Sequence, residues 1–326
     1  MGDKDQRTAI PTTVVKGKRK LNEAGVKALT VFASRYSKIG MAGIKAEFEE
    51  AKKECKPIQK SFTFVEATIH SELNRNVETC PDVNRVVLTC NVPPNTDFYN
   101  ANYITMPEFD RPFIAAQTPM PHTISDFWRM VFQENCSTVL MAGSPKENDA
   151  VEFWPKKLAD HCNYNDIFVN TRRVDENSDY IIYKLEVLPE GCSNSVLVSL
   201  IVCLDWPENS RRAGHFLGFL KAWKQFPSLM EVNAKDPVVV ISRLGQGRTG
   251  AVLLYHAAAL AVTQGKEINL KSLLKSLRKQ RPGLVGTADQ YAWVVMNVLL
   301  YYSVKVSGIL AYTTSLKHEY DKIKLE

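Results

Sequence analysis

The chain has 326 residues, of which 45% are hydrophobic and 23% are charged. This balance is typical of a globular protein and excludes a collagen, a coiled coil and a chain that is disordered throughout. Lysine and arginine number 41 against 35 aspartates and glutamates, which gives a net charge of +6. Such a mild basic excess suits an anionic partner, for example a phosphate or an acidic peptide, and gives no specific indication of nucleic acid.

The seven cysteines are odd in number, and no two are spaced C-x-x-C. This argues against a disulfide framework and a zinc site and favours a reducing, cytoplasmic compartment. No cluster has the spacing of a metal site, and we expect neither a metal nor a cofactor. The most apolar stretch, Tyr291–Val304, is too short to span a bilayer and is expected to be a buried helix. Residues 1–20 are expected to form a flexible basic tail before a single domain over residues 21–326.

The first third of the chain is predicted to pass from helix to strand. Apolar residues recur at helical spacing from Leu21 to about Cys55, and a second short helix is predicted near Met41–Lys53. Runs rich in β-branched and apolar residues then predict strands at 85–89, 102–105 and 113–116.

The middle of the chain is predicted to be mostly strand. A helix over 125–134, with Ser125 as its N-cap, comes first. Short apolar or alternating runs then predict strands that share one sheet, at 137–141, 168–174, 180–188 and 195–204.

Helices dominate the last third and surround one buried strand at 238–241. They are predicted at 212–226, 250–263, 270–281 and 289–309. The whole pattern predicts an α/β fold with a twisted mixed sheet flanked by helices. Six basic residues on or beside the helix at 270–281 are expected to form a solvated face: Lys266, Lys271, Lys275, Arg278, Lys279 and Arg281.

One segment, VVVISRLGQGRTG from Val238 to Gly250, contains the main candidate for a functional site. A buried strand runs into a loop with Gly245 and Gly247, then Arg248, then the start of a helix. Such a loop can point several backbone N–H groups at one spot, where the helix adds the positive end of its dipole and the arginine a bidentate fork. The segment therefore predicts an anion site. The alternative, a tight turn whose glycines serve only backbone geometry, remains open at this point.

This loop resembles the H-C-x5-R-[S/T]-G signature of the classical protein tyrosine phosphatases. Further motifs resemble that family in the same order over about residues 40–315: DFYNANYI at 97–104, FIAAQTP at 113–119, DFWRMV at 126–131, FWP at 153–155, WPE at 206–208 and the glutamine-bearing loop at 283–290. The resemblance implies a twisted mixed sheet flanked by helices, with the phosphate loop at the C-terminal end of a strand.

The resemblance also shows where this chain departs from the family. Ser242 stands in place of the nucleophilic cysteine and Ile241 in place of the preceding histidine. Glu208 falls on the general acid, Gly286 on the glutamine that positions water, and Asn76 on the tyrosine that stacks on the substrate ring. An alcohol ionises far less readily than a thiol, so the family's nucleophile is lost. Together these changes imply a catalytically inactive member, a pseudophosphatase.

The anion cradle itself is retained. The residues predicted to bind phosphate or phosphotyrosine are Ser242, Arg243, Leu244, Gly245, Gln246, Gly247, Arg248, Asn76 and Gln290. By the same resemblance, Glu147 stands in for the glutamate that holds the arginine. Trp128, Trp154, Trp206, His215 and His256 are expected to be packing or surface residues.

By analogy, the chain is expected to act as a regulatory or scaffold module for a phosphotyrosine-bearing or acidic protein, for example a protein kinase. Two other functions remain open at this point. One is a weak phosphatase that uses Ser242 or water as nucleophile, and the other is a purely structural domain with a blocked pocket.

Overall fold

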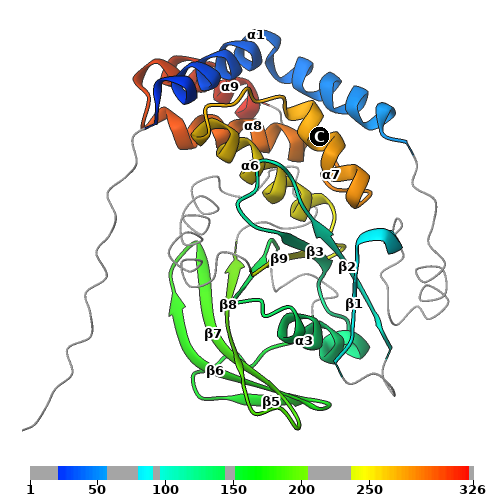
Figure 1. The fold of residues 1–326 in the computed structure, drawn as a ribbon. Coiled ribbons are helices and arrows are strands. Elements are labelled where there is room, and N and C mark those ends of the chain that lie inside the picture. Colours follow the sequence, from blue (N-terminus) through cyan, green and yellow to red (C-terminus); the bar gives the residue numbers. More distant parts are fainter. Residues whose placement is uncertain (1–20, 57–79, 91–95, 144–150, 205–235, 323–326) are drawn as a thin grey trace, which may run out of the picture.

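The computed structural model describes residues 21–56, 80–90, 96–143, 151–204 and 236–322. The predictions for residues 1–20 and for a helix at 212–226 lie outside the described residues. Within these ranges nine strands form one mixed sheet in the order β1-β2-β3-β9-β4-β8-β7-β6-β5 (Figure 1). The strands are β1 Arg85–Val87, β2 Phe98–Ile104, β3 Phe113–Gln117, β4 Thr138–Met141, β5 His161–Tyr164, β6 Ile167–Glu176, β7 Tyr180–Pro189, β8 Val196–Cys203 and β9 Val238–Ser242.

The centre of the sheet is parallel and its two flanks are antiparallel. Strand β9 lies between β3 and β4 and runs parallel to both, and β4 runs parallel to β8. Every residue of β9 is buried, as its unbroken apolar sequence predicts. Because Gln117 of β3 is in register with Ser242 of β9, the C-terminal ends of these strands meet at one edge, where open α/β sheets bind ligands.

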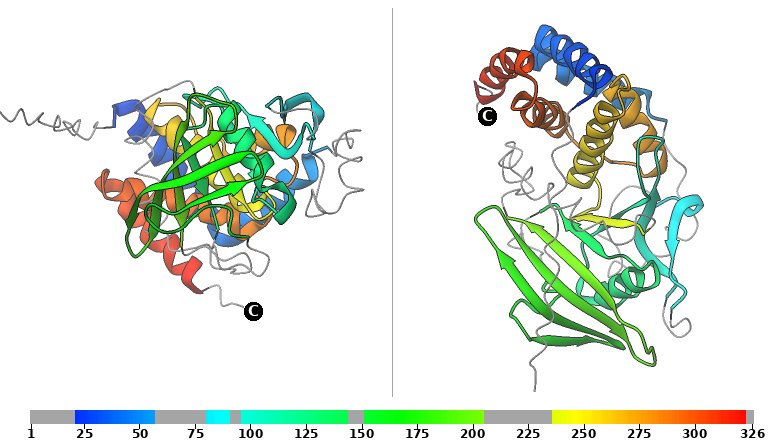
Figure 2. Two further views of the ribbon diagram at one scale, coloured as in Figure 1. Left: turned by 90° about the horizontal axis from the view of Figure 1, so that it is seen from below. Right: turned by 60° about the vertical axis from the view of Figure 1, so that its left-hand side comes forward.

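The helices cover the two faces of the sheet unequally. Of the helices in the described ranges, five gather on one side and α3 lies on the other (Figures 1 and 2). The five are α1 Glu23–Glu54, α6 Gly247–Thr263, α7 Leu270–Gln280, α8 Ala288–Ser303 and α9 Leu310–Lys322; α3 spans Ile124–Gln133. Short 3-10 turns are found at Asp82–Asn84, Pro121–Thr123 and Ser307–Ile309.

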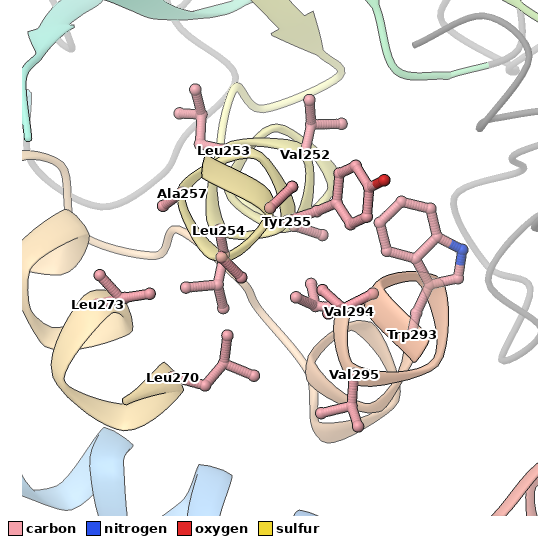
Figure 3. Packing of buried hydrophobic residues seen from close by; sticks show 14 of the residues in the cluster. Val252, Leu253, Leu254, Tyr255, Ala257, Leu270, Leu273, Trp293, Val294 and Val295 are labelled. Carbon is pink, nitrogen blue, oxygen red and sulfur yellow. The ribbon is translucent and has the colours of Figure 1, made fainter. Parts of the chain in front are cut away.

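Two hydrophobic clusters result, one on each face. On the five-helix side, α6, α7 and α8 pack their apolar faces together through residues such as Leu254, Leu270 and Val294 (Figure 3). On the other side, Phe127 and Trp128 of α3 pack against the sheet. Burial of these side chains on both faces provides the main favourable term in the free energy of folding.

The predicted α/β architecture is confirmed, and most of its elements are found near their predicted positions. Helix α1 is the predicted pair of helices joined by a kink at Gly40, whose φ is 62°. Strand β5 and helix α9 were not predicted. The four residues of β5 are partly exposed, and α9 buries only Thr313 and Leu316, so neither carries a clear apolar pattern.

Three predicted helix boundaries are wrong. The N-cap of α3 is Thr123 rather than Ser125, because a 3-10 turn leads directly into the helix. Helix α6 begins before residue 250, since the amide of Gly250 already closes a turn onto the carbonyl of Gln246 at 2.6 Å. The helix predicted at 289–309 ends at Ser303, ahead of a break that contains Gly308.

The basic residues around α7 do not form a plain solvated face. Lys271 pairs with Glu50 and Glu54 of α1 at 2.9 and 2.5 Å, and Lys275 pairs with Glu54 at 2.7 Å. Arg281 is only 1% exposed and lies beneath the loop between β9 and α6. These charges therefore attach helices to one another and support the loop, which periodicity alone did not reveal.

Candidate anion-binding site

The site is the turn from Ser242, the last residue of β9, to Gly247, the first residue of α6. The carbonyl of Ser242 accepts hydrogen bonds from the amides of Thr118 and Gly245, both at 2.9 Å. Gly245 has φ +63°, and a Cβ there would lie 2.3 Å from the carbonyl carbon of Ala116. Both the left-handed backbone and this close approach require glycine, which confirms the predicted geometric role of Gly245.

The start of α6 supplies the donors of the site. First-turn amides have no acceptor within their own helix, and those of Gly247, Arg248 and Thr249 occupy such positions. Gln246 stands at the N-cap, and its side chain makes no capping hydrogen bond. The positive end of the helix dipole therefore faces the turn together with the amides of this first helical turn, the arrangement that binds oxyanions.

The base of the loop carries a pair of hydroxyl groups. Ser242 is 3% exposed, and its Oγ lies 2.8 Å from Oγ1 of Thr249, which is fully buried. The structure thus places the Ser242 hydroxyl beneath the start of α6. A serine hydroxyl that bonds to a second hydroxyl has no base to accept its proton in this pair.

Gln290 of α8 lies against the loop at Gly247. Its Oε1 accepts a hydrogen bond from the amide of Gly286 at 2.7 Å. A Cβ on Gly247 would lie 2.8 Å from both polar atoms of the Gln290 carboxamide, so a side chain there would displace that carboxamide. Gly286 is exposed, and a Cβ there would make only ordinary contacts with Gln290 and Gly247, at 3.6 and 3.7 Å.

The remaining loop residues differ in burial. Arg248 is 4% exposed and Gln246 is 7% exposed, whereas Arg243 and Leu244 are half-buried. The Gln246 carboxamide packs beneath the turn at Gly283, where a Cβ would lie 2.7 Å from its Cδ. Gln246 therefore joins the loop to the turn that precedes α8.

Arg281 lies beneath the loop and donates hydrogen bonds to two of its carbonyl groups. Its Nε donates to the carbonyl of Gly245 at 2.7 Å, and its Nη2 donates to that of Leu244 at 3.2 Å. The other guanidinium contacts are the side-chain oxygens of Asn102 at 2.6 Å and Asn100 at 2.8 Å, both on β2. Through these bonds the loop is fixed to the neighbouring part of the sheet.

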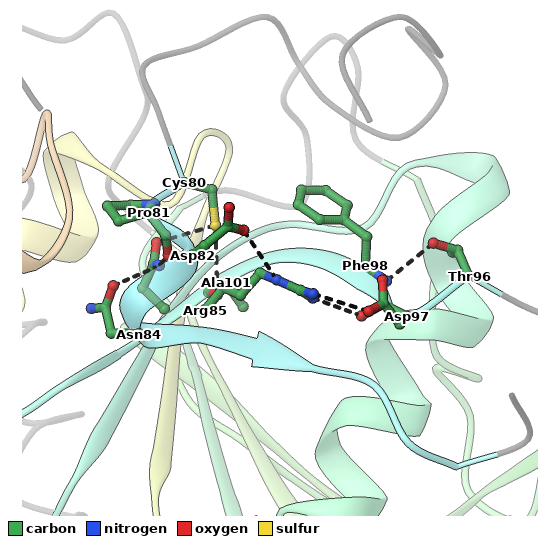
Figure 4. A network of polar contacts seen from close by, with 10 residues as sticks. Cys80, Pro81, Asp82, Asn84, Arg85, Thr96, Asp97, Phe98 and Ala101 are labelled. Carbon is green, nitrogen blue, oxygen red and sulfur yellow. Dashed lines mark hydrogen bonds and ion pairs between the residues drawn. The ribbon is translucent and has the colours of Figure 1, made fainter. Parts of the chain in front are cut away.

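A polar network continues from Asn102 to the segment before β1. The Asn102 amide donates to the carbonyl of Pro81 at 3.1 Å and to the side chain of Asn84 at 3.2 Å. Figure 4 shows Arg85 between Asp82 and Asp97, with ion pairs at 3.2 and 2.9 Å. Residues 80–85, which follow the segment that contains Asn76, are thus attached to the same strand that holds Arg281.

Four predicted site residues lie outside the described residues: Asn76, Glu147, Trp206 and Glu208. Ile241 is described, and it is a buried residue of β9. His215 also lies outside them, whereas His256 is 6% exposed and packs against Phe109 and Phe113, as expected of a core residue. Trp128 and Trp154 are confirmed as packing residues.

Sequence reasoning missed Arg281, Asn100 and Asn102 as parts of the site, and it missed the contact between Thr249 and Ser242. Thr249 follows Arg248 and could have been inferred as the partner of Ser242. The polar residues of the motif at 97–104 gave a weaker signal, since polar side chains in a buried central strand need partners. Nothing in the sequence distinguishes Arg281 from the exposed basic residues near it.

Among the described residues no group of three or more His, Cys, Asp and Glu side chains is placed to hold a metal ion. In the same part of the chain, no helix has the length and apolar character needed to cross a membrane.

The family model for protein-tyrosine phosphatases matches residues 70–300. The chain belongs to the protein-tyrosine phosphatase family. A Caenorhabditis elegans protein provisionally named a tyrosine-protein phosphatase is 34% identical over 208 residues, which cover 63% of this chain and 51% of that protein. Human receptor-type tyrosine-protein phosphatase epsilon is 32% identical over 228 residues, 68% of this chain and 32% of that protein.

A third relative matches along most of its length. A probable tyrosine phosphatase, protein N1 of Microplitis demolitor bracovirus, is 25% identical over 291 residues, 86% of this chain and 91% of the viral protein. By contrast, the chain spans about half of the C. elegans relative, 51%, and about a third of the human one, 32%.

Proposed function

We propose that this chain is a catalytically inactive tyrosine-phosphatase-like domain that binds a phosphotyrosine-bearing protein through the loop at 242–248. The observation that carries the proposal is the hydroxyl of Ser242, buried at the base of the loop and hydrogen-bonded to Thr249 at 2.8 Å. Amide donors, helix dipole and Arg248 suit a phosphate, but the group beneath it is an alcohol, whose pKa is far too high for it to ionise at neutral pH.

Other positions support the loss of turnover. By the family resemblance, Gly286 removes the side chain that would position water, and a larger side chain would meet only ordinary contacts there. Ile241 replaces the histidine before the nucleophile, and Glu208 and Asn76 replace the acid and the stacking ring. Loss of general acid–base help alone lowers rates by about 10²–10⁴-fold, and loss of the nucleophile lowers them further.

As a binding module, the domain would serve a regulatory or scaffold role in the cytoplasm. Its partner would be a phosphotyrosine-bearing or acidic protein, for example a protein kinase with a phosphorylated activation loop. The basic excess of the chain, net charge +6, favours such a partner.

Calorimetry with a phosphotyrosine peptide tests the binding proposal. We expect measurable affinity in the wild type and at least about a tenfold weaker affinity in Arg248→Ala, because a charged hydrogen-bonding group contributes roughly 1.5–3 kcal/mol. The control is Arg173→Ala, which removes an exposed arginine of β6. Equal affinity in the wild type and Arg248→Ala would place the interaction on another surface.

Turnover of para-nitrophenyl phosphate tests inactivity. We expect the wild type and Ser242→Ala to match the buffer rate. Ser242→Cys restores only the nucleophile and should raise the rate above that of the wild type. The double variant Ser242→Cys/Gly286→Gln also restores the side chain that positions water, so its rate should be higher still. Wild-type turnover lost in Ser242→Ala would instead show a serine phosphatase, and turnover that survives in Ser242→Ala would indicate a water nucleophile.

A further inference from the structure

Arg281 is a fully buried guanidinium without a carboxylate partner among the described residues. Its four hydrogen bonds go to neutral oxygens, the carbonyls of Leu244 and Gly245 and the amides of Asn100 and Asn102. It is 1% exposed, and burial lowers its pKa from the usual value, although an arginine stays protonated in proteins.

A second buried arginine shows what is unusual about Arg281. Arg129 is also 1% exposed and also donates to backbone carbonyls, those of Cys90 and Thr96. Arg129 in addition forms an ion pair with Asp126 at 2.6 Å. Buried charges are normally paired in this way, because an unpaired charge inside a protein costs several kcal/mol.

Among the described residues, the groups nearest Arg281 do not neutralise it. Cys80 lies beside Asn102, its Sγ 3.4 Å from the Asn102 side-chain oxygen. Burial raises the pKa of the Cys80 thiol above its ordinary value, so it is uncharged at neutral pH. In the described part of the chain, the positive charge of Arg281 therefore has no neutralising partner on this side of the loop.

The peptide bonds of the loop connect the two sides. In a trans peptide the N–H points opposite to the preceding carbonyl. Since the carbonyl of Gly245 points to Arg281, the N–H of Gln246 points away from it. A cation on the carbonyl side polarises this peptide and strengthens its N–H as a donor to an anion.

We propose that the anion bound by the loop is the counter-ion of Arg281 and that this buried charge selects a dianion over a monoanion. The ligand class is then a phosphate monoester rather than a sulfate ester. Arg281 acts as a positioning residue that also supplies charge, without contact with the ligand. This inference rests on the proposed binding function and adds the reason for its charge preference.

Asn100 offers the sharpest test. Its Oδ1 accepts from Arg281 at 2.8 Å, whereas its buried Nδ2 has no hydrogen-bond partner among the described residues. Asn100→Asp therefore keeps the accepting oxygen, loses no described hydrogen bond and gives Arg281 an internal counter-ion. Asn163→Asp adds the same charge at an exposed position of β5, on the far edge of the sheet, and serves as the matched control.

The probes are phenyl phosphate and phenyl sulfate at pH 7.5, which share their shape but differ by one charge, since the phosphate monoester loses its second proton near pH 6. The readout is the ratio of their two dissociation constants by calorimetry. We expect Asn100→Asp to reduce the preference for phosphate on the order of tenfold and to raise the thermal stability of the unliganded protein. Asn163→Asp should leave the ratio within about threefold of the wild type.

Arg281→Lys provides a second variant, which keeps the charge but loses the planar fork. Both affinities should fall while their ratio is preserved. A wild-type ratio in Asn100→Asp, or an Asn100→Asp protein less stable than the wild type, would overturn the role of Arg281 while binding itself stands. If the wild type binds neither probe, the proposed binding function fails, and this inference fails with it.

Discussion

Gly245 and Gly286 show that two glycines in one site can be there for different reasons. The φ of Gly245 is +63°, and the backbone of Ala116 and Gln117 occupies the place of a Cβ. Gly286 has neither constraint, and its nearest neighbours would be 3.6 Å or more from a Cβ. Glycine at 245 is therefore required by the turn, whereas glycine at 286 leaves space beside Gln290.

We expect Gly245→Ala to lower the free energy of unfolding by about 2–4 kcal/mol, because the strained φ and the backbone clash add together. Gly286→Ala should change it by less than about 0.5 kcal/mol. Urea denaturation of both variants gives the comparison. Equal stability of the two would mean that the loop can relax away from Ala116.

The hydroxyl pair at Ser242 and Thr249 gives a second prediction at this scale. Thr249→Val leaves the buried Ser242 hydroxyl without its partner at 2.8 Å, which should cost about 1–3 kcal/mol. The double variant with Ser242→Ala removes both groups and should recover part of that loss. Strictly additive losses in this double-mutant cycle would contradict a direct interaction.

At the scale of elements, α1 is attached to α8 by a buried carboxylate. Glu47 of α1 accepts hydrogen bonds from Tyr36 at 2.5 Å and from Tyr291 of α8 at 2.6 Å, and it also pairs with Arg35. Tyr291 follows Gln290 directly, so this contact fixes the helix start that carries a site residue. Burial alone would raise the pKa of Glu47, but the hydrogen bonds from Arg35, Tyr291 and Tyr36 outweigh it and lower that pKa.

The sign of this shift predicts a pH dependence. Because the folded-state pKa lies below the unfolded value of about 4.3, the stabilisation is complete above that pH and is lost as the pH falls through the lower folded value. Glu47→Gln should flatten this loss of stability at acid pH and lower stability at pH 7 by about 1.5–3 kcal/mol. Glu49→Gln, which removes an exposed carboxylate from the same helix, is the control. If Glu47→Gln loses stability at low pH as the wild type does, other carboxylates cause that loss.

The kink in α1 is held by α9. The backbone turns at Gly40, and the carboxylate of Glu319 accepts from the amide of Met41 at 2.9 Å, as an N-cap would for the second half of the helix. Glu319→Ala should cost about 1 kcal/mol and speed amide exchange in α9. Exchange unchanged in α9 would show that Leu316 and its neighbours suffice to hold it.

At the scale of the molecule, the central strands contribute side chains to both hydrophobic clusters. Leu140 of β4 packs with the helices on one face, and Leu200 of the adjacent β8 packs with α3 on the other; both are fully buried. Because the two faces share these strands, they should unfold together.

Leu140→Ala and Leu200→Ala should each cost about 2–5 kcal/mol and shift one common transition. Circular dichroism and tryptophan fluorescence should report the same midpoint for each variant. Separate midpoints for the two probes would show that one face can unfold without the other.

The sequence alone determined the α/β class, the positions of most strands and the loop at 238–250, because these depend on local patterns of apolar residues and glycines. It also determined which residue types stand in the loop. The left-handed turn at Gly245 was predictable for the same reason, since only glycine adopts that backbone without strain.

The tertiary structure alone decided which distant residues complete the site. Arg281 and Asn100 are separated along the chain, and the α7 basic run gave no sign that one of its members is buried. The contacts of Arg281 with Asn100 and with the carbonyls of Leu244 and Gly245 depend on the order of strands and on the packing of α7 against the sheet. Burial and charge pairing are properties of the assembled fold, because they depend on neighbours that no local sequence pattern specifies.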